Sequence, residues 1–296
     1  MIEALIMLAA QAASVYNAET TFRKLAHAHP GISIASDAVP ASVRAERNLS
    51  YVVHETGPLQ LDLYLPRAAA GPAPVVLLVH GGGWRSGERS NLAPLAVRLA
   101  ARGYAAATVT YRLSPTARYP AAIHDVKDAV NWLQKRRDID PRRIAVAGGS
   151  AGGQIASLVG VTSDKVHAVI NIDGLSDFTS EAARLHEDDP AKNPSAAGAW
   201  FGGRYAEKTA LWHDASPTFH VSRNSPAMLF IGSGEARFSV GRDEMMQKLK
   251  AHGVTTELVI FPGTPHSFWL FDPWLAPTVD ATVDFLDRVF NVRTAK

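Results

Sequence analysis

The chain has 296 residues, of which 47% are hydrophobic and 20% charged, and its formal net charge is +2. This composition is typical of a soluble globular protein with one large α/β domain or two small ones, and the near-neutral charge gives no reason to expect a nucleic-acid or membrane partner. The lack of cysteine excludes disulfides, thiolate metal sites and a cysteine nucleophile.

The N-terminal stretch "MIEALIMLAAQAAS" contains a short apolar run from Ala4 to Ala10. The run has Glu3 in place of a positive n-region and is too short to span a bilayer. We therefore expect a helix that packs on the domain and continues to about Leu25, which favours a cytoplasmic location. An atypical export signal, and so an exported or periplasmic protein, is the alternative. Residues 30–48 read as a linker, so residues 1–48 precede a domain over residues 49–296.

That domain begins with two strand-like runs around Gly57-Pro58, which predict an antiparallel hairpin. Short apolar runs then predict buried strands at residues 74–80, 105–111, 143–149, 167–173, 227–233 and 257–261. Helical patterns lie between them, with apolar stripes at Ile123, Val126, Val130 and Leu133 and at Val279, Val283, Leu286 and Phe290. This alternation indicates a mostly parallel sheet covered by helices on both faces, with ligands at the carboxyl ends of the strands. Residues 178–212 interrupt the alternation and are expected to form a small cap or lid.

The stretch "RIAVAGGSAGGQIAS" places Ser150 between glycine pairs, where a predicted strand meets a predicted helix. A Gly-x-Ser-x-Gly pattern alone would arise by chance in roughly one chain of this length in ten, given glycine and serine frequencies of about 7%. Its strand–turn–helix context is that of a nucleophile elbow, in which glycines allow neighbouring backbones to approach closely. The alternative is a serine that only caps a helix on a glycine turn.

A serine nucleophile needs donors for the oxyanion that it creates. The stretch "VVLLVHGGGWRSG" ends a strand with three glycines, whose backbone N–H groups are free to point into a site. We expect Gly82, Gly83 and Ala151 to supply the donors, and His80 to be a structural residue that fixes this loop. The alternative is a flexible surface loop.

The general base is expected late in the chain, after the last strand, where "ELVIFPGTPHSFW" supplies His266. The acid should follow the strand at residues 227–233. Glu235 is the first carboxylate there, with Asp243 as the alternative, and either would orient the imidazole and stabilise its charged form. Asp173 and Asp177 follow an earlier strand and are more distant options.

Five motifs occur in an order that resembles the α/β-hydrolase superfamily: "VHGGGWRSGE", "YRLSPTARYPAAIHDVKDAVNWL", "AVAGGSAGG", "DASPTFHVS" and "PGTPHSFW". They resemble most the carboxylesterases and feruloyl- or acetylxylan-esterase-like enzymes related to hormone-sensitive lipases. The likeness runs from about Tyr51 to Phe290. It implies an eight-stranded sheet, a Ser–acid–His triad and no cofactor or metal.

The resemblance assigns the nucleophile to Ser150, the base to His266 and the oxyanion loop to Gly82 and Gly83. It also makes Asp125 and the Tyr111-Arg112 pair structural. The chain departs from the family at the acid, because relatives usually have a Gly-x-x-Asp pattern where this chain has "GSGE", ending at Glu235.

Aromatic residues fall in loops beside the predicted site, and Trp84, Phe268 and Trp200 are expected to line a substrate pocket. We therefore predict a serine carboxylesterase that hydrolyses short acyl esters of aryl alcohols or carbohydrates through an acyl-enzyme. An amidase, such as an arylformamidase or a peptidase, and a catalytically silent binding protein are the alternatives. The sequence leaves the natural ester and the oligomeric state open.

Overall fold

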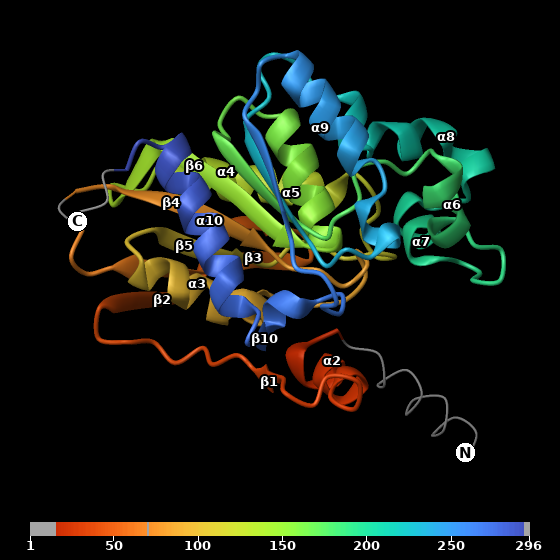
Figure 1. Cartoon of the computed structure of the whole chain (residues 1–296). Helices are drawn as coiled ribbons and strands as arrows, with labels where there is room; N and C mark the ends of the chain where they lie inside the picture. Colours follow the sequence, from red (N-terminus) through yellow and green to blue (C-terminus); the bar gives the residue numbers. More distant parts are fainter. Residues whose placement is uncertain (1–15, 70, 293–296) are drawn as a thin grey trace.

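An eight-stranded sheet forms the centre of the computed structural model, which describes residues 16–69 and 71–292. The strand order is β2-β3-β5-β4-β6-β7-β8-β9 (Figure 1). The first three strands of this order are antiparallel neighbours, and β5, β4, β6, β7, β8 and β9 run parallel. The strands are β2 (Val43–His54), β3 (Gly57–Pro66), β4 (Ala73–Val79), β5 (Ala105–Val109), β6 (Ile139–Gly149), β7 (Ala168–Ile172), β8 (Ala227–Gly232) and β9 (Thr256–Ile260).

The six apolar runs that predict buried strands all lie in this sheet, so the mostly parallel architecture is confirmed. Every residue from Val75 to Val79 is fully buried, as expected for a central strand covered on both faces. Because β4, β6 and β7 are parallel neighbours, the loops that follow them meet at one edge of the sheet. Ser150 is the first residue beyond β6 at that edge.

Helices cover both faces of the sheet, and their apolar stripes are buried against it. On one face lie α3 (Ala93–Ala101) and α10 (Leu275–Val289), in one hydrophobic cluster. On the other lie α4 (Ala121–Gln134), α5 (Ala151–Val161) and α9 (Arg242–Ala251), in a second cluster (Figure 1). The stripe from Ile123 to Leu133 is at most 4% exposed, which confirms the helical period expected there.

The region before the domain differs in part from the expected linker. Strand β2 begins at Val43, inside the predicted linker, and β1 (Ser33–Ile34) pairs with β10 (Phe271–Asp272). These strands were hard to predict because β1 has only two residues and most residues of β2 are not buried. Neither strand therefore has a clear alternation of apolar and polar residues. Helix α2 (Ala18–Leu25) ends at the expected residue, whereas the rest of the predicted N-terminal helix, over residues 1–15, lies outside the described residues.

The predicted lid consists of α6 (Glu181–Glu187), α7 (Ala196–Phe201) and α8 (Tyr205–Asp214), which project beyond the carboxyl ends of the strands (Figure 1). An aromatic cluster holds it to the body of the protein. Trp84 stacks on Trp200 with ring centroids 4.9 Å apart, and Phe178, Phe201 and Trp212 pack around this pair. These aromatic residues belong to the same hydrophobic cluster as α4, α5 and α9, so the α6–α8 segment is anchored to the core of the domain.

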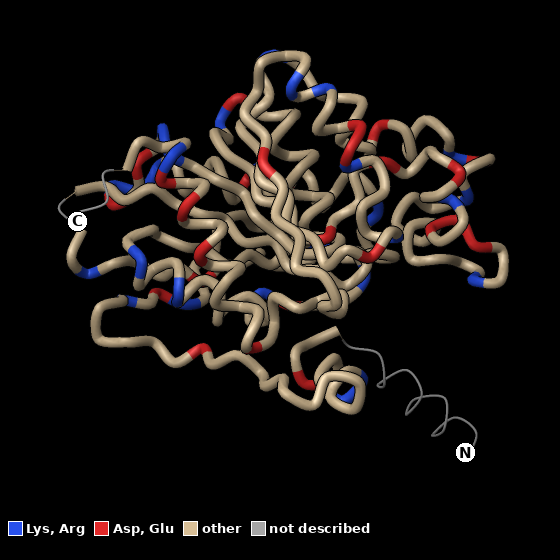
Figure 2. The backbone as a smooth tube through the Cα atoms, viewed as in Figure 1, with Lys and Arg blue, Asp and Glu red and all other residues tan. Residues whose placement is uncertain are grey.

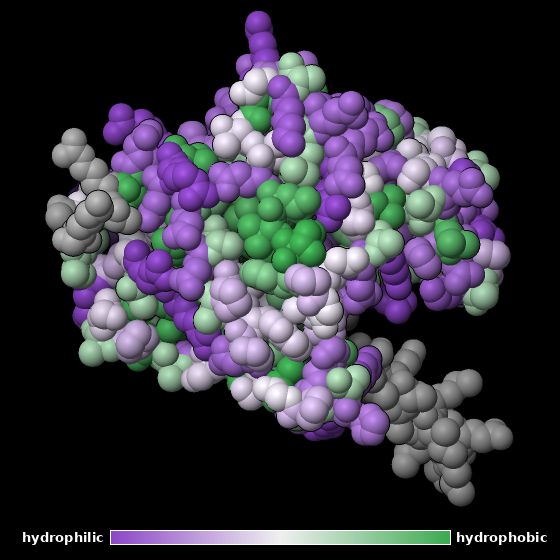
Figure 3. All heavy atoms as spheres, in the orientation of Figure 1, coloured by the Kyte–Doolittle hydropathy of each residue, from purple (hydrophilic) through white to green (hydrophobic). Residues whose placement is uncertain are grey.

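The surface carries both signs of charge and one apolar area in the view of Figure 1. Lysines, arginines and acidic residues are interspersed around the chain (Figure 2). Hydrophobic side chains gather beside α10 and over the edge strand β9, where Leu258 is 40% exposed (Figure 3). Among the helices of the described residues, none has the length and apolarity to cross a membrane. Over the same residues, no cluster of three or more His, Asp or Glu side chains is arranged to hold a metal ion.

Candidate active site

Ser150 occupies a sharp turn between β6 and α5. Its backbone has φ 57° and ψ −124°, a conformation that non-glycine residues adopt rarely and at an energetic cost. The surrounding glycines make this turn possible. A Cβ on Gly152 would lie 2.0 Å from the carbonyl oxygen of Val79, and one on Gly148 would lie 2.4 Å from the backbone of Gly152. The strand–turn–helix geometry predicted for this motif is therefore present.

His266 lies in the loop after β9 and faces the serine. Its Nε2 is 2.9 Å from the Ser150 Oγ, within hydrogen-bond distance. The ring of Phe238 stacks on the imidazole with centroids 3.5 Å apart, and Trp269 packs edge-on at 5.3 Å. These two aromatic side chains fix the plane of the imidazole. The structure thus brings together the two residues that the sequence paired.

The acidic partner of the imidazole is Asp173, and the expectation of Glu235 is wrong. Asp173 directly follows β7, and its Oδ2 accepts a hydrogen bond from His266 Nδ1 at 3.1 Å. Its Oδ1 accepts another from the backbone N–H of Ser233 at 2.9 Å. The Asp173 side chain is only 3% exposed, and its backbone has a φ of +50°. The two hydrogen bonds, one to each oxygen, hold the carboxylate in one position.

Glu235 and Asp243 have other roles in the structure. The Glu235 Oε1 accepts a hydrogen bond from the backbone N–H of His266 at 3.1 Å, so it holds the loop rather than the ring. Asp243 lies in the first turn of α9, where its exposed carboxylate pairs with Arg242. Asp177, the remaining option, accepts hydrogen bonds from the backbone of Thr179 and Ser180. The carboxyl ends of β7 and β8 are adjacent, so an acid after either strand can reach the same histidine.

The glycine loop after β4 lies against the serine. Gly82 and Gly83 have positive φ values of 119° and 60°, which favour glycine. Gly82 forms the turn itself, since a Cβ there would lie 2.1 Å from the carbonyl oxygen of Ser86. Gly83 and Ala151 line the cavity beside Ser150, and neither backbone N–H is used in a hydrogen bond with another described residue. The cavity therefore presents two free backbone donors next to the Ser150 hydroxyl.

His80 is a buried structural residue, in agreement with its expected place under the loop. Its ring stacks on Tyr111 at 4.4 Å, and its Nδ1–H donates to the carbonyl oxygen of Gly81. Burial lowers the pKa of His80 to about 4, so the imidazole is neutral at ordinary pH. Asp125 is likewise fully buried. Its carboxylate accepts hydrogen bonds from Arg112 and His54, away from Ser150.

The cavity at Ser150 has a volume of about 90 Å³. Of the three predicted pocket residues, only Trp84 lines it. The expectations of Trp200 and Phe268 are wrong, because both side chains are fully buried among other aromatic rings. The cavity is lined by Gly83, Trp84, Ser150, Ala151, Asp173, Leu175, Glu187, Ala196, Arg237 and Phe238.

Several of these lining residues carried no signal in the sequence. Glu187 and Arg237 form a 3.1 Å ion pair that joins the end of α6 to the short helix η4 (Ala236–Ser239). Phe238 on η4 covers the imidazole. These contacts depend on how the lid and the loop after β8 fold over the sheet edge, and no local pattern encodes that arrangement.

The comparisons with known proteins identify the family of this chain. A sequence profile of the BD-FAE family matches residues 61–244. The chain belongs to the BD-FAE family. Its fold is that of the α/β-hydrolases, as the sequence resemblance implied. The solved "hyperthermophilic esterase" from the archaeon Pyrobaculum calidifontis has a TM-score of 0.67 and 28% identity, over 83% of this chain and 85% of that one.

Curated relatives of this BD-FAE chain include Esterase LipC of Mycobacterium tuberculosis (strain ATCC 25618 / H37Rv). LipC is 33% identical over 75% of this chain and 60% of its own length. Ethyl acetate hydrolase of Pseudomonas putida is 28% identical over 75% of this chain and 74% of its own length. The chain spans 56–60% of the length of LipC and of two further esterases of the same strain.

Proposed function

We propose that this BD-FAE protein hydrolyses carboxylic esters with Ser150 as nucleophile, His266 as general base and acid, and Asp173 as the acid that orients the imidazole. The observation that carries the proposal is the chain of two hydrogen bonds, 2.9 Å from Ser150 to His266 and 3.1 Å from His266 to Asp173. The esterase and ester hydrolase names of its relatives support it. They favour an ester over an amide as the bond that is cleaved.

The reaction follows from the position of each group. The Ser150 Oγ attacks the ester carbonyl while His266 Nε2 takes its proton, and the resulting oxyanion receives hydrogen bonds from the free N–H groups of Gly83 and Ala151. His266 then gives the proton to the departing alcohol, which leaves an acyl-Ser150 ester. Water attacks this ester with His266 again as base, and the acid and Ser150 are released. Asp173 holds the Nδ1–H and stabilises the imidazolium in both halves.

A short acyl group is the second part of the proposal. Sites that enclose drug-sized ligands have volumes of roughly 300–1,000 Å³, and a water molecule occupies about 30 Å³ of liquid. A cavity of about 90 Å³ therefore accommodates an acyl group of a few atoms, such as acetyl or propionyl. A larger alcohol, aromatic or carbohydrate, would extend out of this cavity toward Arg237, which is exposed. The name of the ethyl acetate hydrolase relative supports the short acyl preference.

The test combines a substrate series with covalent labelling. p-Nitrophenyl acetate should be hydrolysed with a higher kcat/KM than the butyrate and octanoate esters, and N-formylkynurenine should be turned over more slowly than any of the short esters. A fluorophosphonate should add one equivalent to the wild type, located at Ser150 by peptide mass spectrometry, and nothing to Ser150→Ala. Labelling at another residue contradicts the serine mechanism, and a preference for octanoate contradicts the short acyl assignment.

A further inference from the structure

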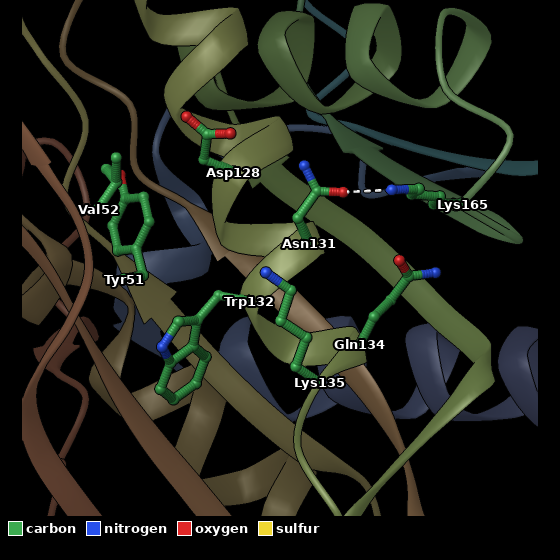
Figure 4. Close-up of a pocket in the computed structure, with 8 residues that line it drawn as sticks. All are labelled: Tyr51, Val52, Asp128, Asn131, Trp132, Gln134, Lys135 and Lys165. Carbon is green, nitrogen blue, oxygen red and sulfur yellow. Dashed lines mark hydrogen bonds between the residues drawn. The ribbon is translucent and has the colours of Figure 1, made fainter.

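A second cavity lies between the exposed face of α4 and the edge strand β2 (Figure 4). We call it the α4 groove. Its volume is about 460 Å³, within the range of ordinary small-ligand sites of about 300–1,000 Å³. It is lined by Tyr51, Val52, Asp128, Asn131, Trp132, Gln134, Lys135 and Lys165. It shares no lining residue with the cavity at Ser150.

The α4 groove lies away from the catalytic edge of the sheet. Helix α4 ends at Gln134 and leads into the beginning of β6 at Ile139, whereas Ser150 follows the other end of β6. Trp132, Gln134 and Lys135 are therefore near the amino end of β6, and the catalytic residues are at its carboxyl end. A ligand in the α4 groove would not touch the reacting atoms.

Polar groups without partners converge on the groove. The Asp128 carboxylate, the Trp132 indole N–H, the Gln134 amide and the Lys135 ammonium make no hydrogen bond or ion pair with any described residue. Two other polar side chains of α4 are satisfied, since Asp125 bonds to Arg112 and Lys127 donates to a backbone carbonyl. The exposed His124 makes no side-chain hydrogen bond with a described residue. Apart from His124, the unpartnered polar groups of this helix and its C-terminal end lie on the side that faces the groove.

The spacing along α4 explains why these groups gather. Asp128, Asn131, Trp132 and Lys135 are three, four and seven residues apart, which places them on one face of the helix. Figure 4 shows them on successive turns of α4, with Tyr51 and Val52 across from them. The indole is held by the Arg136 guanidinium, 5.4 Å from its ring centre, and Arg136 is itself paired with Glu46 and Asp138.

The chemistry of the α4 groove fits a ligand rich in hydroxyl groups. It offers a carboxylate acceptor, amides that both donate and accept, and indole and ammonium donors, and a hydroxyl group can pair with each of these. One Asp and two Lys side chains nearly balance in charge, and Lys165 is already engaged with Asn131 at 2.6 Å. The apolar edges of Tyr51 and Trp132 suit the C–H faces of a sugar ring, because aromatic side chains combine an apolar surface with a polar tip.

We propose that the α4 groove is a binding site for a neutral, polyhydroxylated ligand of the size of a short oligosaccharide, separate from the catalytic cavity. The ligand would hydrogen-bond to Asp128, Gln134 and Lys135 and rest its C–H surface against Trp132. The proposal does not depend on the esterase mechanism, because none of these side chains belongs to the catalytic machinery.

The experiment uses the full chain with Ser150→Ala, so that no probe is hydrolysed. Cellohexaose, xylohexaose and maltohexaose are titrated by calorimetry, and bound sugar protons are mapped by saturation-transfer NMR. We expect at least one of the three to bind, and Trp132→Ala and Asp128→Asn each to weaken that binding about tenfold, the effect of losing one good contact to a buried or charged group. Asp284→Asn, which alters an exposed helical carboxylate on α10, is the matched control and should leave binding unchanged.

Trp132 also packs on the core, so Asp128→Asn and Gln134→Ala keep the test valid if Trp132→Ala fails to fold. Absence of binding by all three oligosaccharides, or binding that both Asp128→Asn and Gln134→Ala leave intact, would overturn the proposal. So would binding of polygalacturonate alone that Lys135→Ala abolishes, since the site would then select anions. Hydrolysis of p-nitrophenyl acetate by Asp128→Asn with Ser150 intact should match the wild type and reports the esterase function independently.

Discussion

The two sides of Ser150 are built in different ways. On the side of β4 and β6, backbone geometry fixes the site: glycines at 82, 148 and 152 have neighbours within 2.4 Å of where a Cβ would be. On the side of β7 and β8, side chains reach across to the imidazole, and two carboxylates lie close enough to bond to His266, one to its ring and one to its backbone. Where close backbone contacts form the site, only glycine fits at several positions. Where side chains form the site, the carboxylate can come from the loop after either of two neighbouring strands.

The largest expected effect is on the backbone-built side. Ser150→Ala removes the proposed nucleophile and should lower kcat for p-nitrophenyl acetate by about 10⁶-fold, the loss typical of a serine hydrolase nucleophile. Steady-state kinetics with active-site titration measure it. Circular dichroism should show that the variant remains folded, because the substitution removes only the hydroxyl oxygen and adds no atom to the turn. Turnover close to that of the wild type would refute the mechanism.

The two carboxylates that bond to His266 should differ strongly in their effect on kcat. Asp173→Asn should lower kcat by up to about 10⁴-fold, because the imidazole loses the partner that sets its tautomer and stabilises its charge. Glu235→Gln keeps a hydrogen-bond acceptor for the His266 backbone and should cost less than about tenfold.

Asp243→Asn is the matched control for this pair and should match the wild type, since the exposed Asp243 carboxylate has Arg242 as its one ion-pair partner among the described residues. If Glu235→Gln proved as damaging as Asp173→Asn, the two carboxylates would act as one unit. The carboxylates at His266 would then tolerate substitution no better than the glycines of the turn at Ser150.

The buried His80 should make stability depend on pH. Its pKa is about 4 in the folded protein and about 6.5 in an unfolded chain, so between these values the unfolded state binds the extra proton. The free energy of unfolding should therefore be independent of His80 titration above about pH 6.5. Below that pH it should fall by about 1.4 kcal/mol per pH unit, until the pH reaches the folded-state pKa of about 4.

Urea unfolding of the wild type and His80→Gln at several pH values isolates this contribution. The difference between the two proteins should shrink as the pH falls from 6.5 to 4. A difference that stays constant over this range would mean that His80 is not held neutral by burial.

The smallest expected effect concerns the glycines of the elbow. Gly152→Ala places a Cβ 2.0 Å from the Val79 carbonyl oxygen, and the required backbone shift should destabilise the fold by about 1–3 kcal/mol. Gly31→Ala should leave the melting temperature unchanged, because no atom of another described residue lies within 4 Å of where its Cβ would be. An unchanged melting temperature in Gly152→Ala would show that the elbow is more adaptable than its contacts imply.

The strands, the sharp turn at Ser150 and the place of His266 after the last strand could be predicted from the sequence because each depends on a local requirement. Buried strands need continuous apolar runs, and the elbow needs glycine at fixed offsets from Ser150. The carboxylate that bonds to the imidazole could not be predicted, because strand order places β7 beside β8 and the chain offers a carboxylate after both. Trp200 and Phe268 were misassigned because a large aromatic side chain near a site can equally serve the core, and here both are fully buried.

By itself, the sequence determined the sheet, its helical cover and the serine and histidine at its edge, since these follow from hydrophobic period and from steric limits on single residues. The assembled fold determines which carboxylate contacts the imidazole and which side chains enclose the small cavity at Ser150. It also brings α4 and β2 together to form a second, polar groove. Each of these depends on distances between segments far apart in the chain, and such distances exist only once the sheet has assembled.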